Sequence, residues 1–97
     1  MLIYELRNRW IIIGKNKKVE FTENEHNFLI ALSDNRTTTF KEIADKIYGY
    51  YDEAVRNNIK TIKCKLLKKV DLNIKNVCGI GYRLETKIFF KWGLRWI

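Results

Sequence analysis

The sequence predicts an α+β fold with a small N-terminal antiparallel sheet, three helices and a C-terminal β-hairpin. β-branched and aromatic residues are concentrated before residue 22, and two Thr-x-x-Glu patterns precede segments with helical apolar periodicity. A Gly-x-Gly turn separates two short β-rich segments near the end. Ninety-seven residues are enough for one domain with a single small core. We assign residues 1–85 to this domain and residues 86–97 to an apolar C-terminal extension.

The first 21 residues predict two or three short strands. Residues 2–4 and 10–13 are rich in β-branched and aromatic side chains, and residues 19–21 alternate between apolar and polar. Residues 14–17, with the sequence Gly-Lys-Asn-Lys, have the composition of a turn. We therefore expect a small antiparallel sheet here. Three consecutive threonines at 37–39 favour one further short extended segment.

Two capping boxes predict where the first two helices begin. Thr22 and Glu25 can exchange side chain–backbone hydrogen bonds at the start of a helix that ends near Ser33. Thr39 and Glu42 repeat the pattern at the start of a second helix. The predicted buried faces are Phe28, Leu29 and Leu32 in the first helix, and Ile43, Ala44, Ile47 and Tyr48 in the second.

The third helix is predicted to be the longest, from residue 53 to residue 69, with Asp52 as its N-cap. At a rise of about 1.5 Å per residue it is roughly 25 Å long. Apolar residues recur at helical spacing and form one buried stripe: Val55, Ile59, Ile62, Leu66 and Val70. The opposite face carries cations and small polar residues but no acid: Asn57, Lys60, Thr61, Cys64, Lys65 and Lys68.

Positive charge is concentrated on this helix and on the hairpin that follows it. Eight basic residues and one acidic residue between positions 55 and 83 give this segment +7 of the formal net charge of +8. An ordinary solvated helix face mixes charges of both signs. The distribution therefore predicts a polyanionic partner.

The order of strands, two helices, a longer helix and a hairpin is that of a winged helix-turn-helix. The local sequence resembles the DNA-binding domains of OmpR/PhoB-type response regulators over roughly residues 2–85. The likeness rests on FTENE at 21–25, FKEI at 40–43, NNI at 57–59 and the wing ending GIGYRL at 79–84. Gly79, Ile80 and Gly81 form the wing turn, where glycine permits positive φ.

The resemblance implies that the third helix lies in the major groove and that the hairpin reaches flanking backbone or an adjacent minor groove. It also implies that residues 50–54 correspond to a segment that contacts RNA polymerase in some members. Asn57, Lys60, Thr61, Cys64 and Lys65 match positions that approach bases and phosphates. The predicted DNA-binding set is completed by four further basic residues: Arg56, Lys68, Lys75 and Arg83.

The sequence departs from the family pattern in three respects. Cys78 occupies the place before Gly-x-Gly where family wings often carry arginine, so Lys75 or Arg83 would have to compensate through phosphates. Cys64 and Leu67 occupy helix positions that commonly hold arginine or lysine, so no operator sequence can be copied from a relative. These 97 residues contain no receiver domain, so we expect either a stand-alone regulator or a piece of a longer protein.

The C-terminal extension, residues 86–97, leaves three alternatives open. It is too apolar to remain in water, with aromatic residues between lysines and arginines. It can pack on the N-terminal sheet as a strand or turn, it can form a self-association surface for a homodimer, or it can anchor the chain at a membrane surface.

Several classes of site are not expected. The acids and the lone His26 form no acid–base constellation, and no phosphate-binding glycine loop or nucleophile motif occurs, so we expect no enzyme and no cofactor. No zinc-ligand spacing exists, and we expect His26 on the surface or half-buried. Cys64 and Cys78 are expected to be reduced rather than a redox switch. With no apolar run of about 20 residues and no signal peptide, we expect a cytoplasmic protein without a membrane span.

We therefore predict a sequence-specific double-stranded DNA-binding transcriptional regulator. Two alternatives remain. One is a winged-helix interaction module that docks on RNA polymerase or another regulator, which the missing wing arginine and the apolar extension favour. The other is a non-specific DNA-coating protein, for instance in plasmid maintenance, which the charge alone would satisfy.

Overall fold

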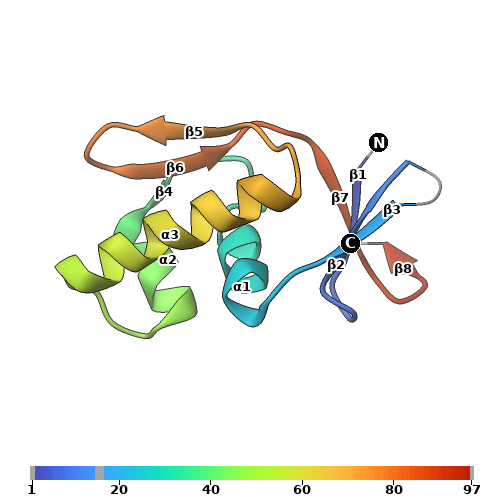
Figure 1. Ribbon diagram of the computed structural model, residues 1–97, viewed down its shortest axis with the longest axis horizontal. Helices are drawn as coiled ribbons and strands as arrows, with labels where there is room; N and C mark the ends of the chain where they lie inside the picture. The colour runs from blue at the N-terminus through green and yellow to red at the C-terminus, as the bar shows by residue number, and fades with distance from the viewer. Residues whose placement is uncertain (1, 15–16, 97) are drawn as a thin grey trace.

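The computed structural model describes residues 2–14 and 17–96. The molecule is elongated, with a five-stranded sheet at one end and the three helices with a smaller sheet at the other (Figure 1). The elements in chain order are β1 (Leu2–Glu5), β2 (Trp10–Ile13), β3 (Lys17–Glu20), α1 (Glu23–Ala31), β4 (Thr38–Thr39), α2 (Phe40–Ile47), α3 (Glu53–Lys69), β5 (Ile74–Val77), β6 (Gly81–Leu84), β7 (Ile88–Trp92) and β8 (Arg95–Trp96). This architecture confirms the predicted fold class.

The N-terminal sheet is larger than the sequence predicted, because both ends of the chain contribute to it. Its strand order is β3-β2-β1-β7-β8, and β1, β2 and β3 pair in antiparallel order as expected. β7 pairs with β1 in parallel, with Leu2 opposite Ile88 and Tyr4 opposite Phe90. A parallel pair needs a long crossover, and here the crossover contains all three helices and the hairpin. The extension thus supplies two strands of the sheet.

α1 begins at the predicted capping box. The amide of Thr22 donates to Glu25 Oε1 at 2.8 Å, and the amide of Glu25 donates to Thr22 Oγ1 at 3.3 Å. The helix ends at Ala31, two residues earlier than predicted, where the Leu32 amide bonds to the Leu29 carbonyl in a tighter turn. α2 has Thr39 as its N-cap, whose hydroxyl accepts from the amide of Glu42.

The hairpin β5–β6 is the wing, and β4 pairs with its inner strand to complete a three-stranded sheet. The two wing positions require glycine for different reasons. Gly79 has φ of +72°, as the sequence predicted for the turn. Gly81 lies in β6 without positive φ, and a Cβ there would stand 1.8 Å from the carbonyl oxygen of Thr38. Gly81 therefore permits the close approach of β4, a requirement that the turn interpretation missed.

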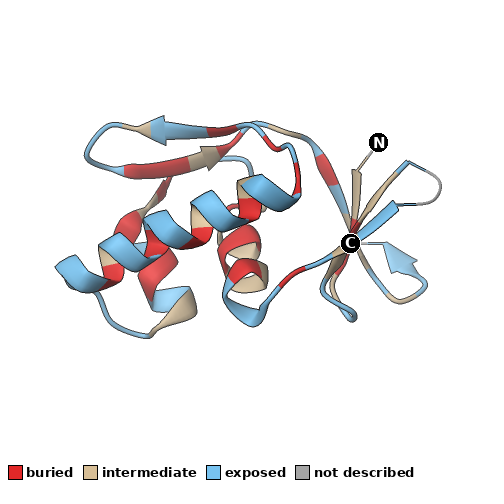
Figure 2. Ribbon diagram, in the orientation of Figure 1, coloured by how far each residue is buried: buried red, intermediate tan, exposed pale blue. Residues whose placement is uncertain are grey.

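The core lies between the helices and the two sheets (Figure 2). Tyr82 of β6 makes edge contacts with Phe28 of α1 and Phe40 of α2, with ring centroids 6.0 and 5.3 Å apart. The predicted helix residues Phe28, Leu29, Leu32, Ile43 and Ala44 are buried, whereas Ile47 and Tyr48 are only half-buried. The wing and the first two helices thereby share one core with the underside of α3.

Candidate nucleic-acid interface

α3 has the bounds and the phase that the sequence predicted. Asp52 Oδ1 accepts from the amide of Val55 at 2.8 Å and caps the helix start. The apolar stripe faces the core, with Ile59 and Leu66 fully buried. The carboxylate of Glu53 in the first turn and the ammonium groups of Lys68 and Lys69 in the last turn complement the helix dipole. Because the apolar stripe is packed in the core, the opposite face of α3 points toward solvent.

The six residues predicted for that outer face are all exposed, and much of α3 that faces the viewer in Figure 2 is coloured accordingly. Four of them follow one another along the helix at i, i+4, i+7 and i+11 and form a central line: Asn57, Thr61, Cys64 and Lys68. Lys60 lies on one side of this line and Lys65 on the other. We call these six residues the α3 outer face. Asn57, Thr61 and Cys64 thus occupy the centre of this face, with Lys60 and Lys65 at its sides and Lys68 at its end.

Lys60, Lys65 and Lys68 make no salt bridge with any acid in residues 2–14 and 17–96. After Glu53 in the first turn, α3 carries no acidic residue at all. These ammonium groups are therefore available to an external anion and give the outer face a positive potential.

Two other lysines of α3 serve the fold instead. Lys69 Nζ donates to Glu25 Oε1 at 2.6 Å and to the carbonyl oxygen of Glu20 at 3.3 Å, so it ties the end of α3 to the start of α1. Lys63 Nζ lies 4.6 Å from the centre of the Tyr82 ring. Sequence reasoning counted both as part of the charged segment and did not identify these contacts.

Burial by itself raises the pKa of Glu25, but the hydrogen bonds from Lys69 and Thr22 outweigh it. The pKa of Glu25 consequently lies below its ordinary value, and the carboxylate is ionised at neutral pH. This buried anion explains why the side chain of Lys69 is held against the protein rather than extended into solvent.

Arg56 is half-buried beside α2 rather than fully exposed. Its guanidinium carbon lies 4.5 Å from the centre of the Phe40 ring, and its buried Nε has no hydrogen-bond partner in the part of the chain that the structure describes. Position 56 is roughly 100° around the helix from Asn57, which separates it from the central line. Arg56 is thus placed at the junction of α2 and α3, with its orientation fixed by an aromatic ring.

The wing presents two of the predicted cations on one face. Lys75 of β5 lies opposite Arg83 of β6, while the neighbouring pair contains the buried Tyr82. Like charges in directly opposite positions repel, and Arg83 Nη2 donates to Glu85 Oε1 at 2.9 Å, which offsets this. Lys75 is exposed. The tip residues Cys78, Gly79 and Ile80 are also exposed.

The remaining sequence predictions concern the cysteines, a metal site, a membrane span and the loop between α2 and α3. Cys64 and Cys78 are free thiols. In residues 2–14 and 17–96 no group of His, Cys, Asp and Glu has the arrangement of a metal site, and no helix there is long and apolar enough to cross a membrane. Tyr50 and Tyr51 are exposed in the loop between α2 and α3, within the segment implied to contact polymerase.

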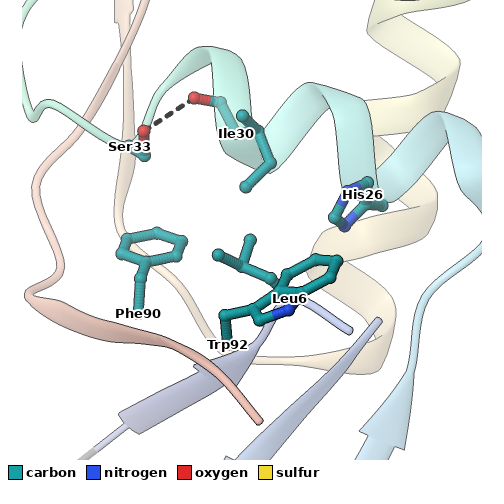
Figure 3. Close-up of a pocket in the computed structure, with 6 residues that line it drawn as sticks. All are labelled: Leu6, His26, Ile30, Ser33, Phe90 and Trp92. Atoms are coloured by element: carbon teal, nitrogen blue, oxygen red, sulfur yellow. Dashed lines mark hydrogen bonds between the residues drawn. The ribbon is translucent and has the colours of Figure 1, made fainter. Parts of the chain in front are cut away.

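A cavity of about 490 Å³ lies between α1 and the N-terminal sheet (Figure 3). It is lined by Leu6, His26, Ile30, Ser33, Phe90 and Trp92. His26 is half-buried, as expected, and its Nδ1 lies 2.6 Å from the hydroxyl of Tyr4. Burial, with a smaller effect from Arg9, lowers the pKa of His26, so the neutral imidazole accepts from the hydroxyl.

Comparison with known proteins identifies the fold. No protein-family model matches the sequence, and the search of curated proteins gives no match. Among solved structures, the chain is similar to the DNA-binding domain of Bacillus subtilis CssR, with a TM-score of 0.68 and 18% identity over 78% of this chain and 90% of that one. The fold is a winged helix-turn-helix. This likeness confirms the fold that the sequence motifs predicted.

Proposed function

We propose that this chain is a sequence-specific double-stranded DNA-binding transcriptional regulator, which acts in the cytoplasm. The observation that carries the proposal is the α3 outer face, where three lysines without salt-bridge partners in the described residues surround small polar side chains. The fold likeness to a domain described as DNA-binding supports it. A helix roughly 25 Å long whose exposed face carries no acid after the first turn suits the major groove, which is about 12 Å wide.

In this proposal the residues divide into two groups by chemistry. Lys60, Lys65 and Lys68 contact phosphates and supply affinity for any duplex. Asn57 and Thr61 on the central line contact base edges and supply sequence preference, with Cys64 beside them. Arg56 reaches a phosphate beside the α2–α3 junction, and Lys75 and Arg83 place the wing on flanking backbone, with no arginine at Cys78 to enter the minor groove.

Fluorescence anisotropy with a panel of labelled duplexes tests this division. Lys65→Ala and Lys68→Ala should each weaken binding to every duplex by a similar factor, because they remove contacts without sequence information. Asn57→Ala should instead change the order of preference among duplexes. Lys46→Ala, an exposed lysine on α2, is the matched control and should change neither. Identical effects from the lysine and the asparagine changes would contradict the division.

A second candidate function is a protein-interaction module that docks on RNA polymerase through residues 50–54. The exposure of Tyr50 and Tyr51 favours it, because large aromatic side chains are enriched at protein interfaces. A pull-down of polymerase by the wild-type chain, compared with a Tyr50→Ser, Tyr51→Ser double variant, separates this candidate from DNA binding. Unchanged duplex affinity and lost capture would support a polymerase contact in addition to DNA binding.

We further propose that the extension mediates a homodimer. Trp92, Leu94 and Trp96 remain 54%, 98% and 61% exposed after β7 and β8 join the sheet, so a large apolar surface is left uncovered by this chain. A second copy bound there would bring two α3 helices into one assembly, which could then contact two half-sites. Sedimentation velocity should show a dimer that Leu94→Ser weakens. A monomer at all accessible concentrations would exclude it.

A further inference from the structure

We infer that the operator preferred by this chain has A·T base pairs beneath Asn57, Thr61 and Cys64. The inference rests on the proposed function and specifies the class of DNA sequence that the α3 outer face selects. It follows from what the central line presents and from where the arginine of α3 is held.

The central line is the part of α3 that faces base edges when the helix lies in a groove. Its direction is opposite to the buried stripe that includes Ile59 and Leu66. Lys60 and Lys65 flank it, so their ammonium groups lie nearer to the phosphates on each side of the groove. Base selection thus depends on Asn57, Thr61 and Cys64 of the central line rather than on the lysines.

Asn57 matches adenine. Its side chain is exposed and has no hydrogen-bond partner in residues 2–14 and 17–96. The amide offers one acceptor and one donor, and adenine presents the complementary pair, a donor at N6 and an acceptor at N7. Guanine presents two acceptors at O6 and N7, so the amide oxygen would face another acceptor. Asn57 therefore favours adenine over guanine.

Thr61 and Cys64 match thymine. The hydroxyl of Thr61 donates to the carbonyl oxygen of Asn57 at 3.2 Å, so its proton is already used within the helix. The hydroxyl oxygen can still accept, and the methyl group of Thr61 remains for an apolar contact. An exposed cysteine likewise behaves as a small, weakly polar group, so the methyl group and the thiol offer two apolar contacts. Both suit the C5 methyl group of thymine in the major groove.

Beneath Asn57, Thr61 and Cys64 the central line carries no arginine or lysine, the usual readers of guanine. Arginine makes the commonest bidentate contact to guanine, and Arg56 is the one arginine in α3. Its guanidinium is held 4.5 Å from the Phe40 ring centre and lies away from the central line. Glu53, one turn before Asn57, can accept from cytosine, and Lys68, one turn after Cys64, can donate to guanine. The A·T assignment therefore covers the pairs beneath Asn57, Thr61 and Cys64 and not the pairs beneath Glu53 and Lys68.

Selection of bound duplexes from a random pool by the full chain, at one stated salt concentration, tests the inference. The enriched sequences should share a short A·T segment. Replacing one of these pairs by G·C should weaken binding on the order of tenfold, the usual effect of a mismatch in a specific site. Two base analogues then identify the contacts: 7-deazaadenine lacks the N7 acceptor, and deoxyuridine lacks the thymine methyl group.

Wild type should lose affinity for duplexes that carry either analogue. Asn57→Ala should become insensitive to 7-deazaadenine at one position, and Thr61→Ser, which keeps the hydroxyl and removes the methyl group, should become insensitive to deoxyuridine at another. Lys65→Ala is the control: it should weaken binding to all duplexes and keep both sensitivities. Thr61→Ser changes one exposed methyl group, so its folding should match that of wild type.

The outcomes separate this inference from the proposed function. Tight, selective binding to a segment with G·C pairs at the positions that respond to Asn57→Ala or Thr61→Ser overturns the base assignment alone. Indifference of the wild type to both analogues also overturns the assignment alone. Failure of the pool to yield any preferred duplex overturns the proposed sequence-specific function and the base assignment together.

Discussion

Replacing Lys69 by methionine should destabilise the fold, whereas the same change at the adjacent Lys68 should not. Lys69 Nζ lies 2.6 Å from Glu25 Oε1 and also donates to the carbonyl oxygen of Glu20. The side chain of Glu25 is only 4% exposed. In Lys69→Met the ammonium group is gone, and the buried Glu25 carboxylate keeps only its hydrogen bond from the capping box. Lys68 is exposed and makes no such contact within the described residues.

The size of the effect follows from these exposures. Removing one partner of a buried ion pair costs about 3–5 kcal/mol. The side chain of Lys69 is 36% exposed and partly screened by water, and Glu25 keeps its bond from the Thr22 amide, so we reduce the expected loss to about 2 kcal/mol. In a domain of this size about 1 kcal/mol corresponds to roughly 5 °C, so Lys69→Met should lower Tm by about 10 °C.

Urea and thermal unfolding followed by circular dichroism at neutral pH provide the measurement. Glu25→Gln combined with Lys69→Met should recover part of the stability lost in Lys69→Met, because no unpaired carboxylate then remains buried. Equal Tm values for Lys68→Met and Lys69→Met would refute the structural role of Lys69. Strict additivity of the two changes at positions 25 and 69 would refute the ion pair as its cause.

Two further predictions concern the wing and acid stability. Gly81→Ala should lower the free energy of unfolding in urea by about 3 kcal/mol, because the new Cβ would stand 1.8 Å from the Thr38 carbonyl oxygen. Gly79→Ala should lower it by about 1 kcal/mol, because the backbone is strained there but the Cβ meets no other atom. Equal losses in the two variants would contradict this reasoning. Burial raises the pKa values of Glu5 and Glu25, but hydrogen bonds outweigh it and lower both. The two ionised carboxylates therefore stabilise the fold above about pH 4.3, and this contribution should be lost as pH falls through the lowered pKa values. When the free energy of unfolding is measured against pH, the loss of stability in acid should be less steep in Glu5→Gln than in the wild type.

Local patterns were sufficient to predict most of the fold. The capping box of Thr22 and Glu25 and the N-cap Asp52 act over three residues, so their sequence spacing determines the contact. The apolar stripe of α3 likewise fixes which side of that helix is buried, and with it the exposure of Asn57 and Lys65. These elements could be predicted because each depends on neighbours in the chain.

The rest depends on contacts between distant segments. The parallel pairing of Ile88 with Leu2 joins the two ends of the chain, and no local pattern specifies it. The same is true of Gly81, whose requirement comes from Thr38. On the candidate site, helical phase predicted which cations are exposed, but the ion pair of Lys69 follows only from the position of α1. Sequence charge therefore overestimates the number of cations available to a polyanion.

The salt dependence of duplex binding tests the proposed DNA interface most directly. Of the proposed DNA-binding cations, Arg83 is paired with Glu85, and five have no acid partner within the described residues: Arg56, Lys60, Lys65, Lys68 and Lys75. If each neutralises one phosphate, log K should fall with log salt at a slope of about −4.5, which is roughly 500-fold weaker binding between about 50 and about 200 mM salt. A loss of less than about tenfold over that range would contradict a phosphate-binding α3 outer face.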